Sequence, residues 1–220
     1  CLSSSTGKVL WSHLVGKGKV HLDDRSDFSN PSPVTDGKHV AFFFGNADLF
    51  VYDMKGKEIW RRNLVPEGDK YFAFQWTFST SPILFEGNLI MQVLQRDVPF
   101  SFAGVARGKE GANNIPSYLE AFDFATGKPA WKAERKGDAV AESLEAFTTP
   151  VIAPTSGPGS PLQLLVAGGD ALTGHDPGTG KELWRWGTWN PGKIGHWRLV
   201  PCPVAGSGVA LACAPKKSPV

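Results

Sequence analysis

An eleven-residue pattern occurs four times in this 220-residue chain and constrains its fold more than any other feature. Each copy contains a Gly-Lys pair followed three positions later by a tryptophan. The tryptophans are Trp11, Trp60, Trp131 and Trp184, and the glycines are Gly7, Gly56, Gly127 and Gly180. Asp53, Asp123 and Asp176 precede the turn in three copies, whereas the first copy has Ser3 there. A motif that is repeated along the chain in this way is typical of solenoids and propellers.

A second signal, a small residue or cysteine followed by proline, marks the start of each unit. It occurs at Ser32-Pro33, Ser81-Pro82, Thr149-Pro150 and Cys202-Pro203. Short apolar runs follow at 39–44, 89–94, 162–167 and 209–213, each bounded by turn residues. They are too short for helices and predict strands. The Asp and Gly positions predict a hairpin, because Asp can hold turn amides and Gly tolerates positive φ.

The unit is therefore four strands, and the expected fold is all-β: a β-propeller of four-stranded antiparallel blades. Three complete blades are expected at about 15–64, 65–133 and 134–187, with half blades at 1–14 and 188–220. The absence of helical periodicity disfavours a parallel βαβ fold and predicts less than about a tenth helix. A β-sandwich with similar hairpins is the alternative architecture. The two half blades either pair into a fourth blade or end an arc of a larger ring, and we favour the arc.

Composition excludes several classes of function. The net charge of +2 gives no reason to expect nucleic acid as a partner. No apolar run is long enough for a transmembrane helix. The three cysteines and five histidines show no metal-binding spacing, so no metal site is expected. Cys202 and Cys213 lie at equal distances from Ser207-Gly208 and could face each other across a hairpin.

The pattern Ala-x-Asp-x-x-Thr-Gly-Lys-x-x-Trp, complete at 121–131 and nearly so at 174–184, resembles the docking motif of pyrroloquinoline-quinone (PQQ) type β-propellers. That family includes quinoprotein alcohol dehydrogenases and a non-catalytic outer-membrane assembly lipoprotein of bacteria. The resemblance implies seven or eight blades in the whole ring and a periplasmic or exported location. It also implies that the motif tryptophans, glycines and aspartates are structural, with each tryptophan packed on the glycine turn of a neighbouring blade.

The resemblance further implies that ligands bind on the face formed by the connections into first strands and between second and third strands, hereafter the loop face. Its segments are 13–31, 65–80, 95–117, 134–148 and 185–200. When the four units are aligned on their prolines, the side chains five and six residues before each proline are expected to lie around the central axis of the propeller. Polar and aromatic groups there suit a polar ligand or peptide. The candidate binding residues are Trp76, Arg96, Asp97, Glu145, His196, Trp197 and Arg198.

The expected function is a binding or scaffold module without catalytic residues or cofactor, which takes a protein, a peptide or a polar small molecule. The alternative is part of a PQQ-dependent quinoprotein dehydrogenase, which would need PQQ and calcium. Such enzymes carry adjacent cysteines over the quinone, whereas Cys1, Cys202 and Cys213 are separated. The enzyme alternative stays open, because blades outside this chain could carry the site.

Overall fold

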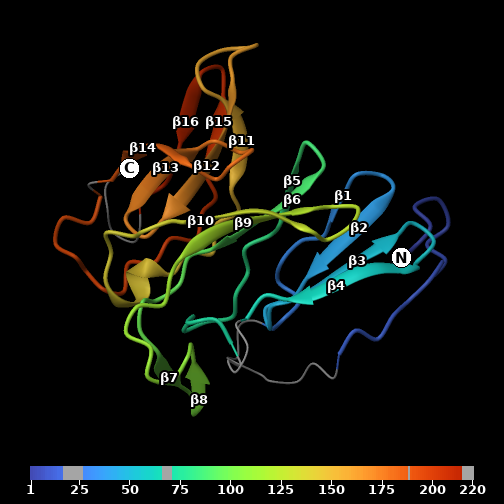
Figure 1. The fold of residues 1–220 in the computed structure, drawn as a ribbon, viewed down its shortest axis with the longest axis horizontal. Coiled ribbons are helices and arrows are strands. Elements are labelled where there is room, and N and C mark those ends of the chain that lie inside the picture. Colours follow the sequence, from blue (N-terminus) through green and yellow to red (C-terminus); the bar gives the residue numbers. More distant parts are fainter. Residues whose placement is uncertain (17–26, 66–70, 188, 215–220) are drawn as a thin grey trace.

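The structure is a computed structural model that describes residues 1–16, 27–65, 71–187 and 189–214. The central part of the predicted loop-face segment 13–31 lies outside these residues. Three four-stranded antiparallel sheets follow one another along the chain, which confirms the predicted fold class (Figure 1). Helix is confined, in the described ranges, to one short 3-10 turn, η1 (Ala141–Leu144).

The first sheet contains β1 (Val34–Thr35), β2 (His39–Phe43), β3 (Asp48–Asp53) and β4 (Glu58–Asn63), in that spatial order. The second contains β5 (Ile83–Phe85), β6 (Asn88–Val93), β9 (Tyr118–Asp123) and β10 (Pro129–Glu134). The third contains β11 (Val151–Pro154), β12 (Leu162–Gly168), β13 (Ala171–His175) and β14 (Glu182–Trp186). The predicted apolar runs in these sheets correspond to β2, β6 and β12.

Two further hairpins complete the described strands. β7 (Phe100–Phe102) pairs with β8 (Val105–Arg107) inside 95–117, the connection between the second and third strands of the second blade, hereafter the insertion, for which no strands were expected. β15 (Val204–Gly206) pairs with β16 (Val209–Leu211) after the third sheet. Their register centres on Ser207-Gly208, where both residues have positive φ.

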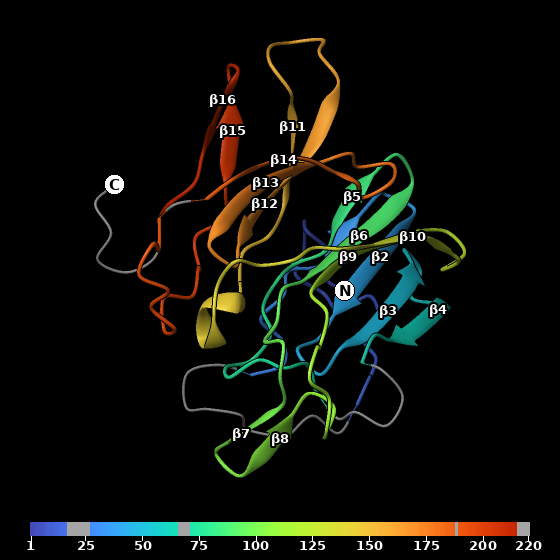
Figure 2. The ribbon, with the colours of Figure 1, turned by 60° about the vertical axis from the view of Figure 1, so that its left-hand side comes forward.

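Buried side chains pack between successive sheets rather than inside a single shared core. One cluster joins the first and second sheets and includes Phe43, Val51, Met91 and Phe122. A second cluster joins the second and third sheets and includes Ile90 and Leu164. Figure 2 shows the sheets fanned against one another in this way. Each blade is thus stabilised by apolar burial against its neighbours, as repeat architectures require.

Motif tryptophans join each blade to the next. A Cβ built on Gly56 would lie 2.7 Å from the ring of Trp11, and one on Gly127 would lie 2.6 Å from the ring of Trp60. Trp131 lies over Gly180 in the same way, with a closest distance of 2.5 Å. These glycines have φ of +86°, +70° and +74°. Glycine is therefore required twice over, by the turn conformation and by the ring on top of it.

Trp184 departs from this arrangement. Its Nε1 donates to Gln163 Oε1 at 2.7 Å within its own blade, and it is 37% exposed. The described chain places no Gly-Lys hairpin beyond the third sheet, because only two strands follow it. The implied packing of Trp184 on a neighbouring glycine turn is therefore absent from the described residues.

The aspartates of the motif hold the turns as expected of Asx-type hairpins. Asp53 Oδ1 accepts from the amides of Lys55 and Lys57, at 2.8 and 2.9 Å. Asp123 Oδ1 accepts from the Thr126 amide and hydroxyl, at 2.8 and 2.6 Å. These hydrogen bonds lower the pKa values of the two carboxyl groups. The bond from the Lys57 amide has the largest effect on Asp53, and the bond from the Thr126 hydroxyl has the largest effect on Asp123.

The residues that precede the four prolines form a ladder from blade to blade. The amide of Ser32 donates to Ser81 Oγ at 2.9 Å, and the amide of Ser81 donates to Thr149 Oγ1 at 3.2 Å. The amide of Thr149 donates to Cys202 Sγ at 3.1 Å. This last hydrogen bond shows that β15 and β16 continue the repeat, with Cys202 at the position that a serine or threonine has in the other units.

The described terminal segments do not join each other, so the molecule is an open arc. Leu2 and Val9 form an isolated bridge at one end, and β15–β16 form a separate two-stranded sheet at the other. The alternative of a closed four-bladed ring, with 209–213 paired to the first residues of the chain, is not what the described strands form. No helix in the described ranges is long and apolar enough to span a membrane.

Candidate functional site

Two opposite sides of the arc carry different kinds of connection. The turns between first and second strands and between third and fourth strands lie toward the top and right of Figure 1, whereas the β7–β8 hairpin and the η1 turn lie toward the bottom and lower left. The second side is the loop face. Its segments are joined by backbone contacts: Ala146 forms a parallel bridge with Leu199, and the Ala146 amide donates to Leu94 O at 3.2 Å.

The η1 turn fixes one carboxylate of this face. Ser143 Oγ donates to Ile194 O at 2.5 Å and accepts from the Trp197 amide at 2.9 Å. The Ser143 amide donates to Gly195 O at 3.1 Å. These contacts lock η1 to the segment that leads into the next half blade. Glu142, on η1, is thereby held beside that segment.

A first cluster brings together side chains from four connections. Trp76 Nε1 donates to Glu142 Oε1 at 2.9 Å, and Arg198 forms a short ion pair with the same oxygen through Nη1. The guanidinium of Arg198 also lies over the Trp76 ring, 5.5 Å from its centroid. Phe102 of the insertion contacts Trp76 edge to face, with centroids 5.0 Å apart.

A second cluster lies next to the first. Arg96 Nε donates to Glu145 Oε1 at 2.5 Å, and Arg96 Nη2 donates to Gln75 Oε1 at 2.6 Å. The Gln75 amide donates to Glu145 Oε2 at 3.0 Å. The Arg96 guanidinium also stacks over Phe100 at 4.0 Å. Both oxygens of Glu145 are therefore engaged by the protein itself.

Glu145 is fully buried, and this changes its acidity. Burial raises the pKa of Glu145 to about 7, and the neighbouring Arg96 acts in the opposite direction. The pKa of a carboxyl group rises when burial removes its contact with water and a neighbouring cation offsets only part of that loss. Glu145 thus belongs to an internal polar network below the surface.

The remaining candidates lie apart from these clusters. Asp97 and His196 are exposed. Asp97 lines a separate cleft of about 240 Å³ together with Asn114, Arg135 and Lys136. The Trp197 side chain is half-buried. The structure therefore brings together Trp76, Arg96, Glu145 and Arg198 but not the other three.

Gln75 and Glu142 complete the clusters and are not among the seven candidate binding residues. Gln75 lies directly before the candidate residue Trp76 in the sequence. Glu142 lies one turn before the candidate residue Glu145. Proximity to Trp76 and Glu145 was the signal that could have identified them. Leu144, which occupies the aligned position in the third blade, is instead 7% exposed and is a packing residue.

Cysteine and metal-ligand geometry bears on the dehydrogenase alternative. Cys1, Cys202 and Cys213 are exposed and free. Within the described ranges, no group of three or more His, Cys, Asp or Glu side chains lies close enough together to hold a metal ion.

This geometry defines a class: an arc of a β-propeller with docked tryptophans and a polar loop face. In particular, the arc resembles a quinohemoprotein alcohol dehydrogenase from Comamonas testosteroni, with a TM-score of 0.60 and 16% identity over 95% of this chain and 35% of that one. It also resembles a europium-containing methanol dehydrogenase, with a TM-score of 0.50 and 13% identity over 73% of this chain and 32% of that one. BamB from Moraxella catarrhalis gives a TM-score of 0.41 at 14% identity, over 71% of this chain and 36% of that one.

The first two similarities show that the chain has a β-propeller fold similar to that of these two dehydrogenases, as the docking motif predicted. The chain spans about a third of the length of these proteins. No protein-family model and no curated protein sequence matches it.

Proposed function

We propose that this propeller arc is a non-catalytic binding module whose loop face holds a protein or peptide partner. The observation that carries the proposal is the meeting of Trp76, Glu142 and Arg198, from three different connections, at one place on that face. Tryptophan and arginine are the usual energetic anchors of protein interfaces. A rigid, hydrogen-bonded cluster of this kind also loses little conformational entropy on binding.

The state of the carboxylates supports binding rather than catalysis. Glu142 and Glu145 already accept hydrogen bonds from Arg198 and Arg96. A catalytic base or calcium ligand needs an oxygen free for the reacting group or ion. These two carboxylates are instead used to hold neighbouring blades together.

The second candidate is part of a PQQ-dependent dehydrogenase, and the fold similarity is the observation that favours it. In that family adjacent cysteines cover the quinone. Cys202 accepts from the Thr149 amide in the inter-blade ladder, and all three cysteines are separate and free. The residues of this chain do not fit the group, so we derive no reaction through it.

The test compares partner retention by the 220-residue chain with that of surface variants. Trp76→Ala and Arg198→Ala remove the two anchor side chains of the first cluster, and Lys57→Ala is the control on the opposite rim. Proteins retained from an extract of the source cells are quantified for each immobilised chain. We expect a retained protein to be lost with the loop-face variants and kept with Lys57→Ala. Equal retention by all three variants would contradict a loop-face interface.

A further inference from the structure

Residues 1–11 fold as the third and fourth strands of a blade. Leu2 bridges Val9, and the terminal amino group of Cys1 donates to Trp11 O at 2.8 Å. The complete first blade has the same pairs, with the same shift of register between them, at the corresponding positions: Tyr52 with Glu58, and Val51 with Trp60. In the described ranges, no first or second strand joins this half blade.

β15 and β16 form the converse half, a first and a second strand that lack a third and a fourth in the described chain. They lie at the opposite end of the arc from residues 1–11 (Figure 1). Exposed edge strands invite pairing, and clustered exposed apolar side chains mark interfaces. Among the described residues, every large apolar side chain that is more than half exposed lies at one of these two ends: Leu2, Val9, Leu10, Leu14, Trp186, Val200, Val204, Val209 and Leu211.

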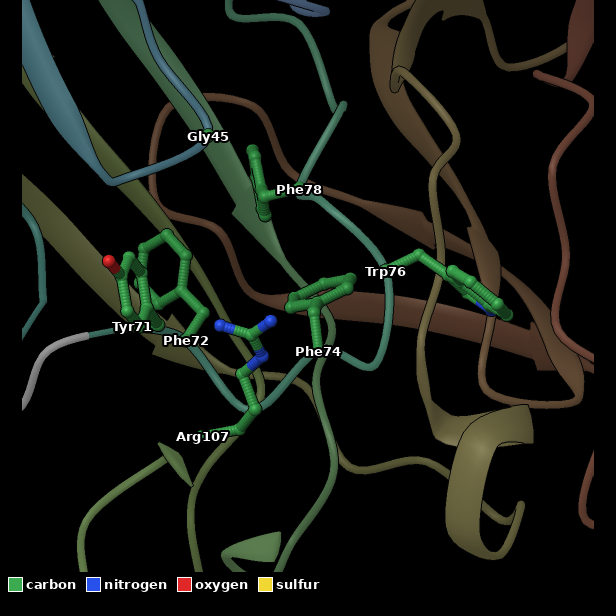
Figure 3. Close-up of a pocket in the computed structure, with 7 residues that line it drawn as sticks. All are labelled: Gly45, Tyr71, Phe72, Phe74, Trp76, Phe78 and Arg107. Carbon is green, nitrogen blue, oxygen red and sulfur yellow. The ribbon is translucent and has the colours of Figure 1, made fainter. Parts of the chain in front are cut away.

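The contact between neighbouring blades, hereafter the seam, is filled where two complete blades meet. Figure 3 shows the space between the first two blades, where Phe74, Phe78 and the buried Arg107 leave only about 10 Å³. By contrast, a groove of about 180 Å³ remains between the third sheet and β15–β16, with Trp184 and Ala210 in its lining. The last seam of the arc is therefore only partly built.

Trp184 and Gly7 are the unmatched members of the docking pattern. Trp184 is 37% exposed, with no Gly-Lys turn of a following blade beneath it among the described residues. Gly7 has φ of +69° and no atom within 4 Å of a Cβ built on it, so no ring covers its turn. Each of the other motif tryptophans covers the glycine of the next blade. If the repeat were cyclic, Gly7 would be the glycine that follows Trp184.

The register of the complete blades shows which residues would meet. In each of them, the residue after the proline pairs with one on the second strand, which pairs with the first residue of the docking motif. These triplets are Val34–Ala41–Val51, Ile83–Ile90–Ala121 and Val151–Leu165–Gly174. In the half blade Val204 pairs with Leu211, and the corresponding motif residue is Cys1. The same register places Cys1 opposite Leu211 and Leu2 opposite Ala210.

We propose that two copies of this chain join head to tail, so that residues 1–11 of each copy complete the blade that β15 and β16 begin in the other. The Gly7 turn of one copy then lies beneath Trp184 of the other, as Gly180 lies beneath Trp131 within one chain. The new contact continues the seam that already joins the blades of each copy.

A head-to-tail contact gives a closed ring only if the successive rotations return to the start. Each copy has three complete sheets, and each junction adds one composite blade. Two copies therefore give eight blades, which is within the usual range of about four to eight, whereas three copies would exceed it. The assembly is independent of the proposed partner-binding role, because the seam uses strand edges and hairpin turns rather than loop-face side chains.

Sedimentation equilibrium of the unmodified 220-residue chain at micromolar concentrations and above tests the assembly. We expect a species with twice the chain mass of 23.7 kDa, and a mass that stays constant as the concentration rises further. A monomer throughout this range, or a mass that keeps growing with concentration, would overturn the two-copy ring.

Disulfide formation tests the register. The Cys1 carbonyl accepts from the Leu10 amide at 2.9 Å, so the backbone groups of Cys1 face the fourth strand. Its pair with Leu211 is then not hydrogen-bonded, and a Cα separation of about 4.5 Å permits a disulfide. In a chain with Cys202→Ser and Cys213→Ser, we expect Leu211→Cys to cross-link two copies on mild oxidation. Ala210→Cys is the matched control, because successive side chains of a strand point to opposite faces.

Non-reducing electrophoresis and peptide mapping show the result. A covalent dimer linked through Cys1 and position 211, and absent from the Ala210→Cys chain, supports the proposal. A disulfide within one chain would show that the half blades close on each other in a single copy. Equal cross-linking of the two variants would contradict the register.

Gly7→Ala tests the docking of Trp184 across the seam. Gly7 and Gly87 both have positive φ and nothing within 4 Å of a Cβ, so Gly87→Ala is matched in backbone cost. We expect Gly7→Ala to raise the dissociation constant of the dimer at least about tenfold, because the methyl group overpacks both seams. Gly87→Ala should leave this constant unchanged. Equal constants for the two variants would mean that Trp184 does not dock on Gly7.

Discussion

The indole ring of Trp60 covers Gly127 so closely that a Cβ on the glycine would lie 2.6 Å from the ring carbon Cδ2. Arg62 reinforces this contact, because its Nε and Nη2 both donate to Gly127 O, at 2.9 and 2.7 Å. The Trp60 N–H donates to Phe124 O at 2.8 Å. Trp60 and Arg62 thus both bind the first blade to the Gly127 turn of the second blade.

We expect Gly127→Ala to destabilise the chain strongly. The new methyl group meets the ring, and φ is +70°, a conformation that alanine adopts at a cost of about 1–2 kcal/mol. Displacing the ring should add about 1–3 kcal/mol, the usual cost of overpacking. Gly87→Ala is the matched control, since Gly87 has φ of +80° and nothing within 4 Å of its Cβ. Urea unfolding measures both, and equal losses for the two variants would contradict docking.

The inter-blade ladder predicts that Cys202 can be replaced by serine but not by alanine. A serine hydroxyl accepts from the Thr149 amide as the Cys202 thiol does, and Ser81 already has this role in the second blade. We expect slower hydrogen exchange at the Thr149 amide in Cys202→Ser than in Cys202→Ala. Equal exchange in both variants would show that the ladder bond is not formed.

The thiols provide another prediction. The register of β15 and β16 places Cys202 and Cys213 opposite each other just beyond the paired strands, yet both are free. We expect thiol titration of the denatured, unreduced chain to give three thiols per molecule. A count of one would indicate a bridge between Cys202 and Cys213.

The motif allowed much of the fold to be predicted, because its interactions are local or repeat from blade to blade. Asp123 and Gly127 define a turn whatever surrounds them, and Trp60 recurs at a fixed offset. The pairing of Arg96 with Glu145 could not be predicted, because it depends on how the insertion folds back. The same is true of Arg107: arginine is usually exposed, and only the packing of β7–β8 against 71–75 buries it.

Glu145 predicts a specific pH dependence of stability. Its pKa is raised to about 7 in the native state, whereas an unfolded glutamate titrates near about 4.3. Between these values the native chain binds a proton that the unfolded chain has lost. The contribution of this group is therefore complete below about pH 4.3 and is lost as the pH rises through 7.

We expect Glu145→Gln to remove this dependence. The unfolding free energy of the variant, minus that of the unmodified chain, should increase from pH 5 to pH 7, by at most about 1.4 kcal/mol per pH unit. Urea unfolding at each pH measures the difference. A difference that stays constant across this range would mean that Glu145 titrates normally.

The central claim, that this chain is a binding module without a quinone site of its own, is tested most directly by calorimetric titration with PQQ. The unmodified 220-residue chain is titrated at neutral pH with calcium present. The separated cysteines and the internally paired Glu142 and Glu145 predict no saturable heat of binding. Saturable binding at micromolar PQQ would contradict the claim and favour the dehydrogenase alternative.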